Sequence, residues 1–374
     1  MAGRAAFFAI ALFLWLIPSI GLIHKYTGNF GLVASIPITL LLIWVIAAFD
    51  SRSLPRHWVW MLVAIAVGLF SILYPIAKSG WLGGGSDRDD ALNVALGALL
   101  SGDYPYSVKT YLNQPVTPMP GALLIGLPFY LLGNSALQNL LWIPLLILWC
   151  VRSIETDSRQ FGYLVLFLFA APAAMQDFVT GGDYLTNAIY VALAMYLVVR
   201  SQSSAVKWHR YAAAAVLAVA LSSRPIYAVA GPLLTGMIYR DFGLARSLRF
   251  VAIVLAVGLI LNLPFFIYNP QQFPTHHLLQ KASPLPRWMH AGIVLPAAAM
   301  LIGCLSFFRR IDLWQAFGIM GLAIALMIYP ALVAGLFVWS FNNYSLSVFG
   351  WALPVSIFAG LWLVSRRTWL RAAR

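Results

Sequence analysis

Three aspartates stand close together in the longest polar interruption of the sequence, residues 83–121. When charged, Asp87, Asp89 and Asp90 repel one another, and this repulsion raises the pKa of at least one carboxyl group. A carboxylate with a raised pKa suits a general base that takes a proton from an attacking alcohol. We therefore expect catalytic proton transfer at this cluster. The alternative is structural, because Asp89 or Asp90 can also cap a helix over residues 91–100.

Aromatic and polar residues follow the aspartate cluster in the same loop. Asp103 and Tyr104 come directly after Gly102, which ends the expected helix, and Tyr106 adds a second aromatic ring. Aromatic faces pack against apolar rings and chains, so this stretch predicts a platform for a sugar or a prenyl chain. A plain turn is the alternative. The candidate substrate-binding residues of the loop are Arg88, Asp103, Tyr104, Tyr106, Lys109, Tyr111 and Asn113.

A second group of residues suits the binding of a phosphate. His276 and His277 are adjacent in a loop over residues 268–287 that also contains Lys281. Histidines near other cations indicate phosphate contact or acid catalysis. Arg224 stands between two apolar segments, where a charge needs a partner. It is either an anchor for a lipid phosphate or half of a structural ion pair.

Two further aspartates, Asp177 and Asp183, flank the polar run Thr180-Gly181-Gly182. We expect both on the same face of the membrane as the 83–121 loop, where they are candidate substrate-binding residues. Either one is also a candidate partner of Arg224 in the structural alternative.

Familiar motifs for metal or nucleotide chemistry do not occur in the sequence. It contains neither HExxH nor a Walker A or GxSxG motif, so zinc and a soluble nucleotide domain are disfavoured. We expect no metal site. If a sugar is transferred, its donor should be lipid-linked and presented from the membrane.

Composition assigns the chain to the polytopic α-helical membrane proteins. Hydrophobic residues make up 61% of the chain and charged residues 9%, and the mean hydropathy is +0.84, which excludes a soluble domain. The net charge of +13 does not indicate nucleic-acid binding, because the basic residues are scattered over short loops. Cys150 and Cys304 fall inside apolar runs and are expected to be packing residues.

The apolar runs predict about twelve transmembrane helices in a single membrane domain, residues 1–374. Three spans occupy residues 1–76, a catalytic loop with interfacial helices follows at 77–136, and the remaining spans lie in 137–374. The apolar runs 211–222 and 226–239 are short for a span, and they suggest a re-entrant or tilted hairpin broken at Ser222-Ser223-Arg224-Pro225. The predicted spans are 6–23, 31–48, 58–76, 137–151, 161–175, 184–200, 211–222, 226–239, 249–267, 288–306, 313–336 and 345–365.

The distribution of basic residues predicts the orientation of these spans. Most of the 24 lysines and arginines fall in loops of one face if both termini are cytoplasmic. The 83–121 loop is then periplasmic or extracellular. This orientation requires that residues 118–133, which include three prolines, form an interfacial helix rather than a span. No internal repeat is visible, which disfavours a transporter.

Several stretches resemble a known enzyme family. The loop GGGSDRDDALNVALGALLSGDYPY, which follows the first spans, resembles the GT-C superfamily of integral-membrane glycosyltransferases. The segments TPMPGALLIGLPFYLLG and FPTHHLLQK resemble the polyprenol-phosphate-mannose-dependent α-mannosyltransferases. Two features differ from the family pattern: two extra spans precede the loop, and three aspartates compete for one role.

The resemblance implies a GT-C-type fold, with Asp87 as the base and His276 or His277 near the donor phosphate. It implies transfer of mannose or a similar hexose or pentose from a polyprenyl-phosphate donor to a lipid or glycan acceptor, at the periplasmic face of a bacterial-type inner membrane. No cofactor is required, although a divalent cation is left as an alternative. We expect a monomer in contact with membrane lipids and no nucleic-acid partner. The competing hypothesis is a transporter or flippase of lipid-linked sugars.

Overall fold

The computed structural model describes residues 2–48, 56–80, 87–153, 158–276, 284–338, 346 and 348–365. In these residues the chain forms helices joined by turns and loops, and no named strand occurs. The one strand-like contact in this part of the chain is an isolated bridge between Lys109 and Pro115. The predicted all-α class is therefore confirmed.

The first half of the chain contains long apolar helices and the shorter helices of the polar loop. The backbone of α2 breaks at Gly28, where φ is 65°. The helices of this half are α1 (Ala2–Leu16), η1 (Ile17–Ser19), α2 (Ile20–Ala48), α3 (Arg56–Lys78), α4 (Arg88–Leu100), α5 (Pro120–Leu131), η2 (Ser135–Gln138), α6 (Asn139–Ser153), α7 (Ser158–Val165), η3 (Leu166–Ala170) and α8 (Pro172–Val179).

The second half consists of further apolar helices and short connecting turns. They are α9 (Tyr184–Ser201), α10 (Lys207–Leu221), η4 (Pro225–Val229), α11 (Ala230–Phe242), α12 (Leu244–Tyr268), η5 (Arg287–Met289), α14 (Ala291–Gly303), η6 (Cys304–Phe307), α15 (Leu313–Val338), η7 (Val348–Ala352) and α17 (Leu353–Ser365).

Seven helices in the described part of the chain are long and apolar enough to cross a membrane, or up to eight if a bent pair counts as one span. This result makes the protein a multi-pass membrane protein. The bent pair is Gly162–Ala170 with Pro172–Val179, which overlaps the predicted span 161–175 and extends beyond it. The seven segments are Ala9–Ile46, His57–Lys78, Ser135–Arg152, Tyr184–Ser201, Leu244–Tyr268, Arg287–Phe307 and Leu313–Val338. The larger count of twelve stays a prediction.

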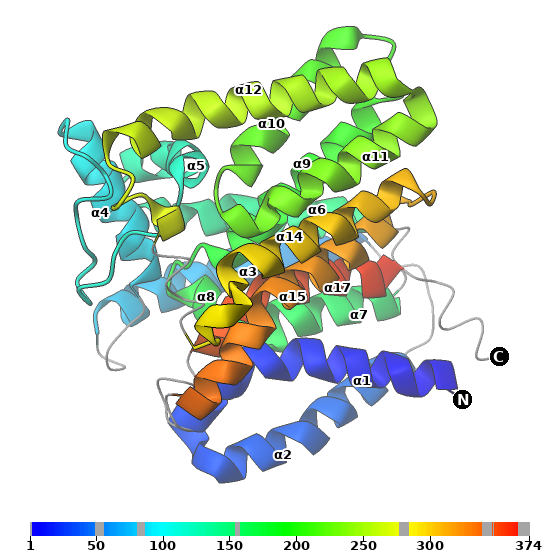
Figure 1. Cartoon of the computed structure of the whole chain (residues 1–374). Coiled ribbons are helices and arrows are strands. Elements are labelled where there is room, and N and C mark those ends of the chain that lie inside the picture. Colours follow the sequence, from blue (N-terminus) through cyan, green and yellow to red (C-terminus); the bar gives the residue numbers. More distant parts are fainter. Residues whose placement is uncertain are drawn as a thin grey trace.

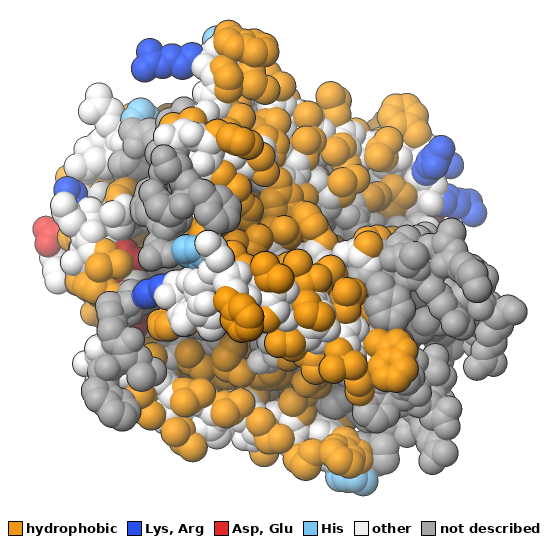
Figure 2. All heavy atoms as spheres, turned by 90° about the horizontal axis from the view of Figure 1, so that it is seen from below, with side chains coloured by type: hydrophobic (Ala, Val, Ile, Leu, Met, Phe, Trp, Pro, Cys, Tyr) orange, Lys and Arg blue, Asp and Glu red, His pale blue; other side chains and the backbone are white. Residues whose placement is uncertain are grey.

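The helices give the molecule two distinct ends (Figure 1). One end carries α4, the adjoining loop and the last turn of α12. The opposite end carries the start of α1, the end of α17 and the turn between α11 and α12. Figure 2 shows hydrophobic side chains over most of one face between these ends. Such a band matches the apolar interior of a bilayer.

The predicted break between two short runs is confirmed. Helix α10 ends at Leu221, and a 3-10 turn begins at Pro225, because proline supplies no N–H to the helical ladder. The carbonyls of Ser222 and Ser223 accept hydrogen bonds of 3.1 Å from the N–H groups of Gly121 and Met119. The unpaired carbonyls at the end of α10 and the unpaired N–H groups at the start of α5 thus satisfy one another.

Helix α5 is the segment predicted to lie on the membrane surface. It has 12 residues, which is shorter than a span. It packs so closely against α10 that a Cβ added to Gly121 would collide with the carbonyl of Val219. Its interfacial position in the membrane stays a prediction.

Of the three buried clusters among the described residues, two hold the long helices together and position the polar loop. The larger one joins the long helices and includes Leu233, Phe317 and Phe358. The smaller one contains Leu92, Leu96, Tyr106, Leu123 and Phe273. It therefore fixes α4 and α5 against the segment that follows α12.

Candidate functional site

Asp87 and Asp90 are bound to a hairpin in the polar loop. The hydroxyl of Thr110 donates a hydrogen bond of 2.6 Å to Oδ2 of Asp87, and the N–H of Tyr111 donates one of 2.8 Å to Oδ2 of Asp90. The hairpin turns at Asn113, whose φ of 58° lies in the left-handed region that asparagine tolerates. The hairpin thus orients both carboxylates.

Helix α4 begins earlier than the sequence predicted. It starts at Arg88, so Asp87 occupies the N-cap position, and Asp89 and Asp90 lie in the first turn. Within the described residues the side chain of Asp87 makes no capping hydrogen bond. The proposed capping by Asp89 or Asp90 is therefore wrong, although both carboxylates lie near the positive end of the helix dipole.

The side chain of Asp89 contacts α3. It is buried, its Oδ2 accepts a hydrogen bond of 2.9 Å from the hydroxyl of Tyr74, and Lys78 Nζ lies 3.7 Å from the same oxygen. Burial raises the pKa of Asp89, while Tyr74 and Lys78 act in the opposite direction. Asp89 thus joins the polar loop to the end of α3.

The turn between α8 and α9 packs closely against Asp89. Gly181 has a φ of 71°, and a Cβ added there would lie 2.8 Å from Cε2 of Tyr74 and 3.2 Å from Cβ of Asp89. Only glycine accepts this conformation without strain in so little space. The close approach connects the aspartate cluster to Asp183, two residues further along the chain.

Asp183 is the ion-pair partner of Arg224. Nη2 of Arg224 lies 2.7 Å from both carboxylate oxygens of Asp183, and the amide of Asn187 donates a further hydrogen bond of 3.1 Å. The carboxylate of Asp177 instead accepts a hydrogen bond from the N–H of Leu185, and its backbone carbonyl accepts one from the N–H of Gly182. Of the two partners that the sequence left open, Asp183 is confirmed.

The guanidinium of Arg224 is buried, and its Nε–H lacks a partner within the described part of the chain. Its Cζ lies 4.5 Å from the ring centroid of Tyr184, and the residue is 6% exposed. Nε has no hydrogen-bond partner among the residues that the structure describes. An unpaired buried donor is costly, so an acceptor that reached this N–H would be bound favourably.

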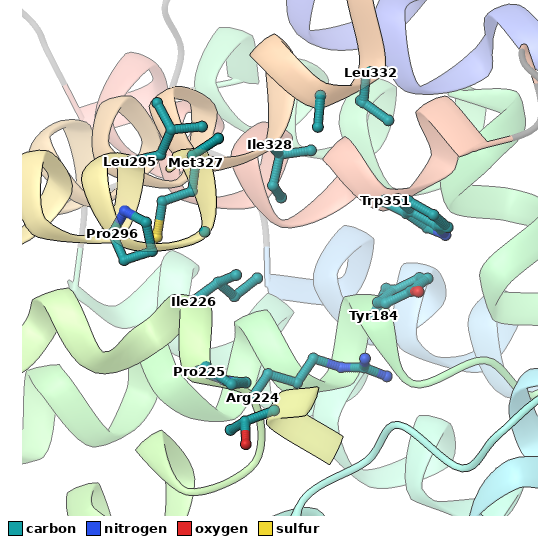
Figure 3. A pocket seen from close by; sticks show the side chains of 14 residues that line it. Tyr184, Arg224, Pro225, Ile226, Leu295, Pro296, Met327, Ile328, Leu332 and Trp351 are labelled. Atoms are coloured by element: carbon teal, nitrogen blue, oxygen red, sulfur yellow. The ribbon is translucent and has the colours of Figure 1, made fainter. Parts of the chain in front are cut away.

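Arg224 lies at the wall of a largely apolar cavity of about 330 Å³. Figure 3 shows Arg224 and Tyr184 close to each other, with Trp351 beside them and Pro296 and Met327 further away. Arg224 is the one charged residue among the described residues of the lining. The arrangement suits an amphiphile with an anionic head and an apolar chain.

Tyr104 and Tyr106 have structural contacts that the sequence did not reveal. The hydroxyl of Tyr104 donates to the carbonyls of Phe265 and Asn269, at 2.9 and 3.2 Å, and its ring stacks on Tyr268 at 4.8 Å. Burial raises the pKa of Tyr104 to about 12, with a smaller contribution from Tyr268. Tyr106 is 3% exposed, so its ring is covered by the smaller cluster rather than open to a ligand.

Other candidate residues lie at the surface of the polar loop. Asp103, Lys109, Tyr111 and Asn113 are exposed. Burial raises the pKa of Tyr111, and the nearby aspartates of the cluster raise it further. Arg88 is the first residue of α4, but its side chain lies outside the described part of the structure.

The histidine loop is described in part. His276 is exposed, and its N–H donates a hydrogen bond of 3.0 Å to the carbonyl of Phe273. The preceding residue, Thr275, lines the cavity. His277 and Lys281 lie outside the described residues.

Sequence reasoning missed several residues of the site. Tyr74 and Lys78 stand four residues apart, so they share one face of α3, but nothing local indicates that this face meets Asp89. Thr110, Tyr184 and Trp351 likewise enter the site through contacts distant in sequence. Among the described residues, no group of three histidine, cysteine, aspartate or glutamate side chains is arranged to hold a metal ion.

Comparison with family models, with curated proteins and with solved structures found no match for this chain.

Proposed function

We propose that the protein is an integral-membrane glycosyltransferase of the GT-C type, with a polyprenyl-phosphate sugar as its donor. The observation that carries this proposal is the apolar cavity with a buried arginine in its wall. An isoprenoid chain fits the apolar lining, and a phosphate fits the unsatisfied Nε of Arg224. Asp183 supports this role because it fixes the guanidinium through Nη2 and leaves Nε without a partner.

The carboxylate site supplies the base for the proposed reaction. Asp87 is half-buried, and Thr110 occupies only its Oδ2 within the described chain. Its other oxygen is the proposed acceptor for the proton of the attacking alcohol. The alcohol oxygen bonds to the anomeric carbon, the bond from that carbon to the phosphate oxygen breaks, and Arg224 stabilises the departing phosphate charge.

Two segments join the carboxylates to the cavity. The Gly181 turn leads from Asp89 to Asp183. The segment after α12 binds the polar loop through Tyr104 and reaches the cavity wall at Thr275. These connections support a shared site for base and donor.

The proposal also includes a GT-C fold of about twelve spans and a periplasmic active site with both termini cytoplasmic. The sugar would be transferred with inversion at the anomeric carbon and without a required metal. A lipid or glycan is the proposed acceptor, with the surrounding lipids as the other partner of a monomeric enzyme.

Substitution of Asp87 tests the proposed function. Asp87→Asn keeps an acceptor for Thr110 but removes the base. In a deletion strain complemented with this variant, mass spectrometry of lipids and glycans should show product reduced about 10²- to 10⁴-fold relative to wild type. Asp241→Asn, a change in an exposed residue of α11, should restore wild-type product. Full product in the Asp87→Asn strain contradicts the mechanism. Movement of a lipid-linked sugar across liposome membranes without turnover would instead identify a flippase.

A further inference from the structure

A second cavity, of about 160 Å³, lies between α10 and α12. Four basic residues line it: Lys207 and Arg210 from α10, and Arg246 and Arg249 from α12. No acidic residue occurs among its described lining. The start of α12 adjoins the α11–α12 turn, at the end of the molecule opposite to α4 (Figure 1). The cavity is therefore separate from the proposed catalytic site.

Three of these four cations lie near the N-terminus of their helix, where a positive charge lowers the stability of the helix. Lys207 and Arg210 occupy the first turn of α10, Arg246 occupies the first turn of α12, and neither first turn contains an acidic residue. The N-terminus of a helix carries a partial positive charge, so cations there destabilise it. A bound anion would relieve the repulsion between the side chains and add favourable contacts with both helices.

Arg246 is held in place before any ligand arrives. Its Nη1 donates a hydrogen bond of 3.4 Å to the carbonyl of the buried Gln202. Its Cζ lies 4.9 Å from the ring centroid of Phe242. A guanidinium fixed in this way loses less side-chain entropy when it binds an anion.

The surroundings of the cavity suit a lipid. Ile253 lines it one turn beyond Arg249, and α12 continues with the exposed residues Leu255 and Leu259. Trp208, between the two basic residues of α10, is also exposed, as is common for tryptophan at a membrane–water interface. The basic cavity thus adjoins an apolar surface that acyl chains can cover.

We propose that this cavity binds a phosphate group, which the headgroup of an anionic phospholipid or free phosphate would supply. Basic residues that only fix membrane orientation act from any position in a loop. They do not need to converge on one cavity without acidic neighbours. Convergence of four cations from two helices on one cavity favours the binding of a phosphate group.

Native mass spectrometry of the full-length protein in detergent tests the proposal. Phosphatidylglycerol and phosphatidylcholine are each titrated against wild type and against Arg210→Gln/Arg249→Gln, which leaves Arg246 and its contact with Gln202 intact. The control is Arg309→Gln/Arg310→Gln, which removes the same charge at residues that share another cavity with Asp241 and Asp312. Wild type and control should bind phosphatidylglycerol at least about tenfold more tightly than phosphatidylcholine, and the test variant should lose this preference.

A competition arm identifies the source of the phosphate. Inorganic phosphate is added at millimolar concentration to wild type and to the test variant with phosphatidylglycerol bound. If phosphate displaces the lipid from wild type but does not change the residual binding to the test variant, the cavity accepts free phosphate. If it does not displace the lipid, the headgroup is the ligand. An equal loss of binding in the test and control variants, or no preference for the anionic lipid in wild type, overturns the proposal.

Discussion

Nη2 of Arg224 lies 2.7 Å from both carboxylate oxygens of Asp183, and both side chains are buried. The pair joins the start of α9 to the break after α10, two points 41 residues apart in the chain. A buried pair is costly to desolvate, but removal of one partner leaves the other as an unpaired charge. The stability of this region therefore depends on both residues together.

Arg224→Gln is expected to destabilise the protein by about 3–5 kcal/mol, because Asp183 would remain charged and buried. Asp183→Asn/Arg224→Gln should cost clearly less than the sum of the two single changes. The free energy of unfolding in mixed micelles, measured for all four proteins, checks this coupling. Additive effects would show that the two side chains do not interact energetically.

Asp89 gives the stability of the protein a defined pH dependence. Burial raises its folded-state pKa above the ordinary value of 3.8, so the folded state holds this proton more tightly than the unfolded state. The resulting stabilisation is full below about pH 4 and is lost as the pH rises through the raised pKa. Asp89→Asn keeps an acceptor for Tyr74 and removes the titration.

The corresponding measurement is the unfolding midpoint of wild type and Asp89→Asn across this pH range. The difference between the two proteins should change in favour of Asp89→Asn as the pH rises. Parallel curves would mean that Asp89 has the same pKa in the folded and unfolded states.

A bulky side chain in the apolar cavity should reduce binding of a lipid-linked donor. Ala331 lines the cavity from α15, and Ala331→Phe would fill part of the space that an isoprenoid chain needs. The dissociation constant of polyprenyl phosphate should rise about tenfold or more, the cost of the lost chain contacts. Val333→Phe is the control, because Val333 is on the same helix and exposed. Equal affinities in the two variants would place the lipid elsewhere.

Gly181→Ala should disturb the turn behind Asp89. The added methyl group meets Ala136, Tyr74 and Asp89 at a φ of 71°, which we expect to cost about 1–3 kcal/mol. Gly231→Ala is the matched control, because a Cβ there has nothing within 4 Å and alanine favours the helix. Thermal unfolding of the two variants should move in opposite directions; a stable Gly181→Ala protein would show that the turn can rearrange.

The sequence by itself determined the class of the protein and several local features. Apolar runs predict membrane helices because the backbone must satisfy its own hydrogen bonds in lipid. The break at Ser222–Pro225 follows from the missing N–H of proline. The sequence predicted that α4 begins at residue 91, and it begins three residues earlier, at Arg88. An error of this size is expected because helix ends depend on weak local preferences.

Only the tertiary structure decided which polar groups meet. Asp177 and Asp183 are both plausible partners for Arg224 in the sequence, and the packing of α9 against the turn after α10 selects Asp183. The same packing turns Asp89 toward Tyr74, leaves Asp87 with Thr110, and encloses the apolar cavity. These contacts join residues far apart in the chain, so they depend on how whole helices pack and not on any local pattern.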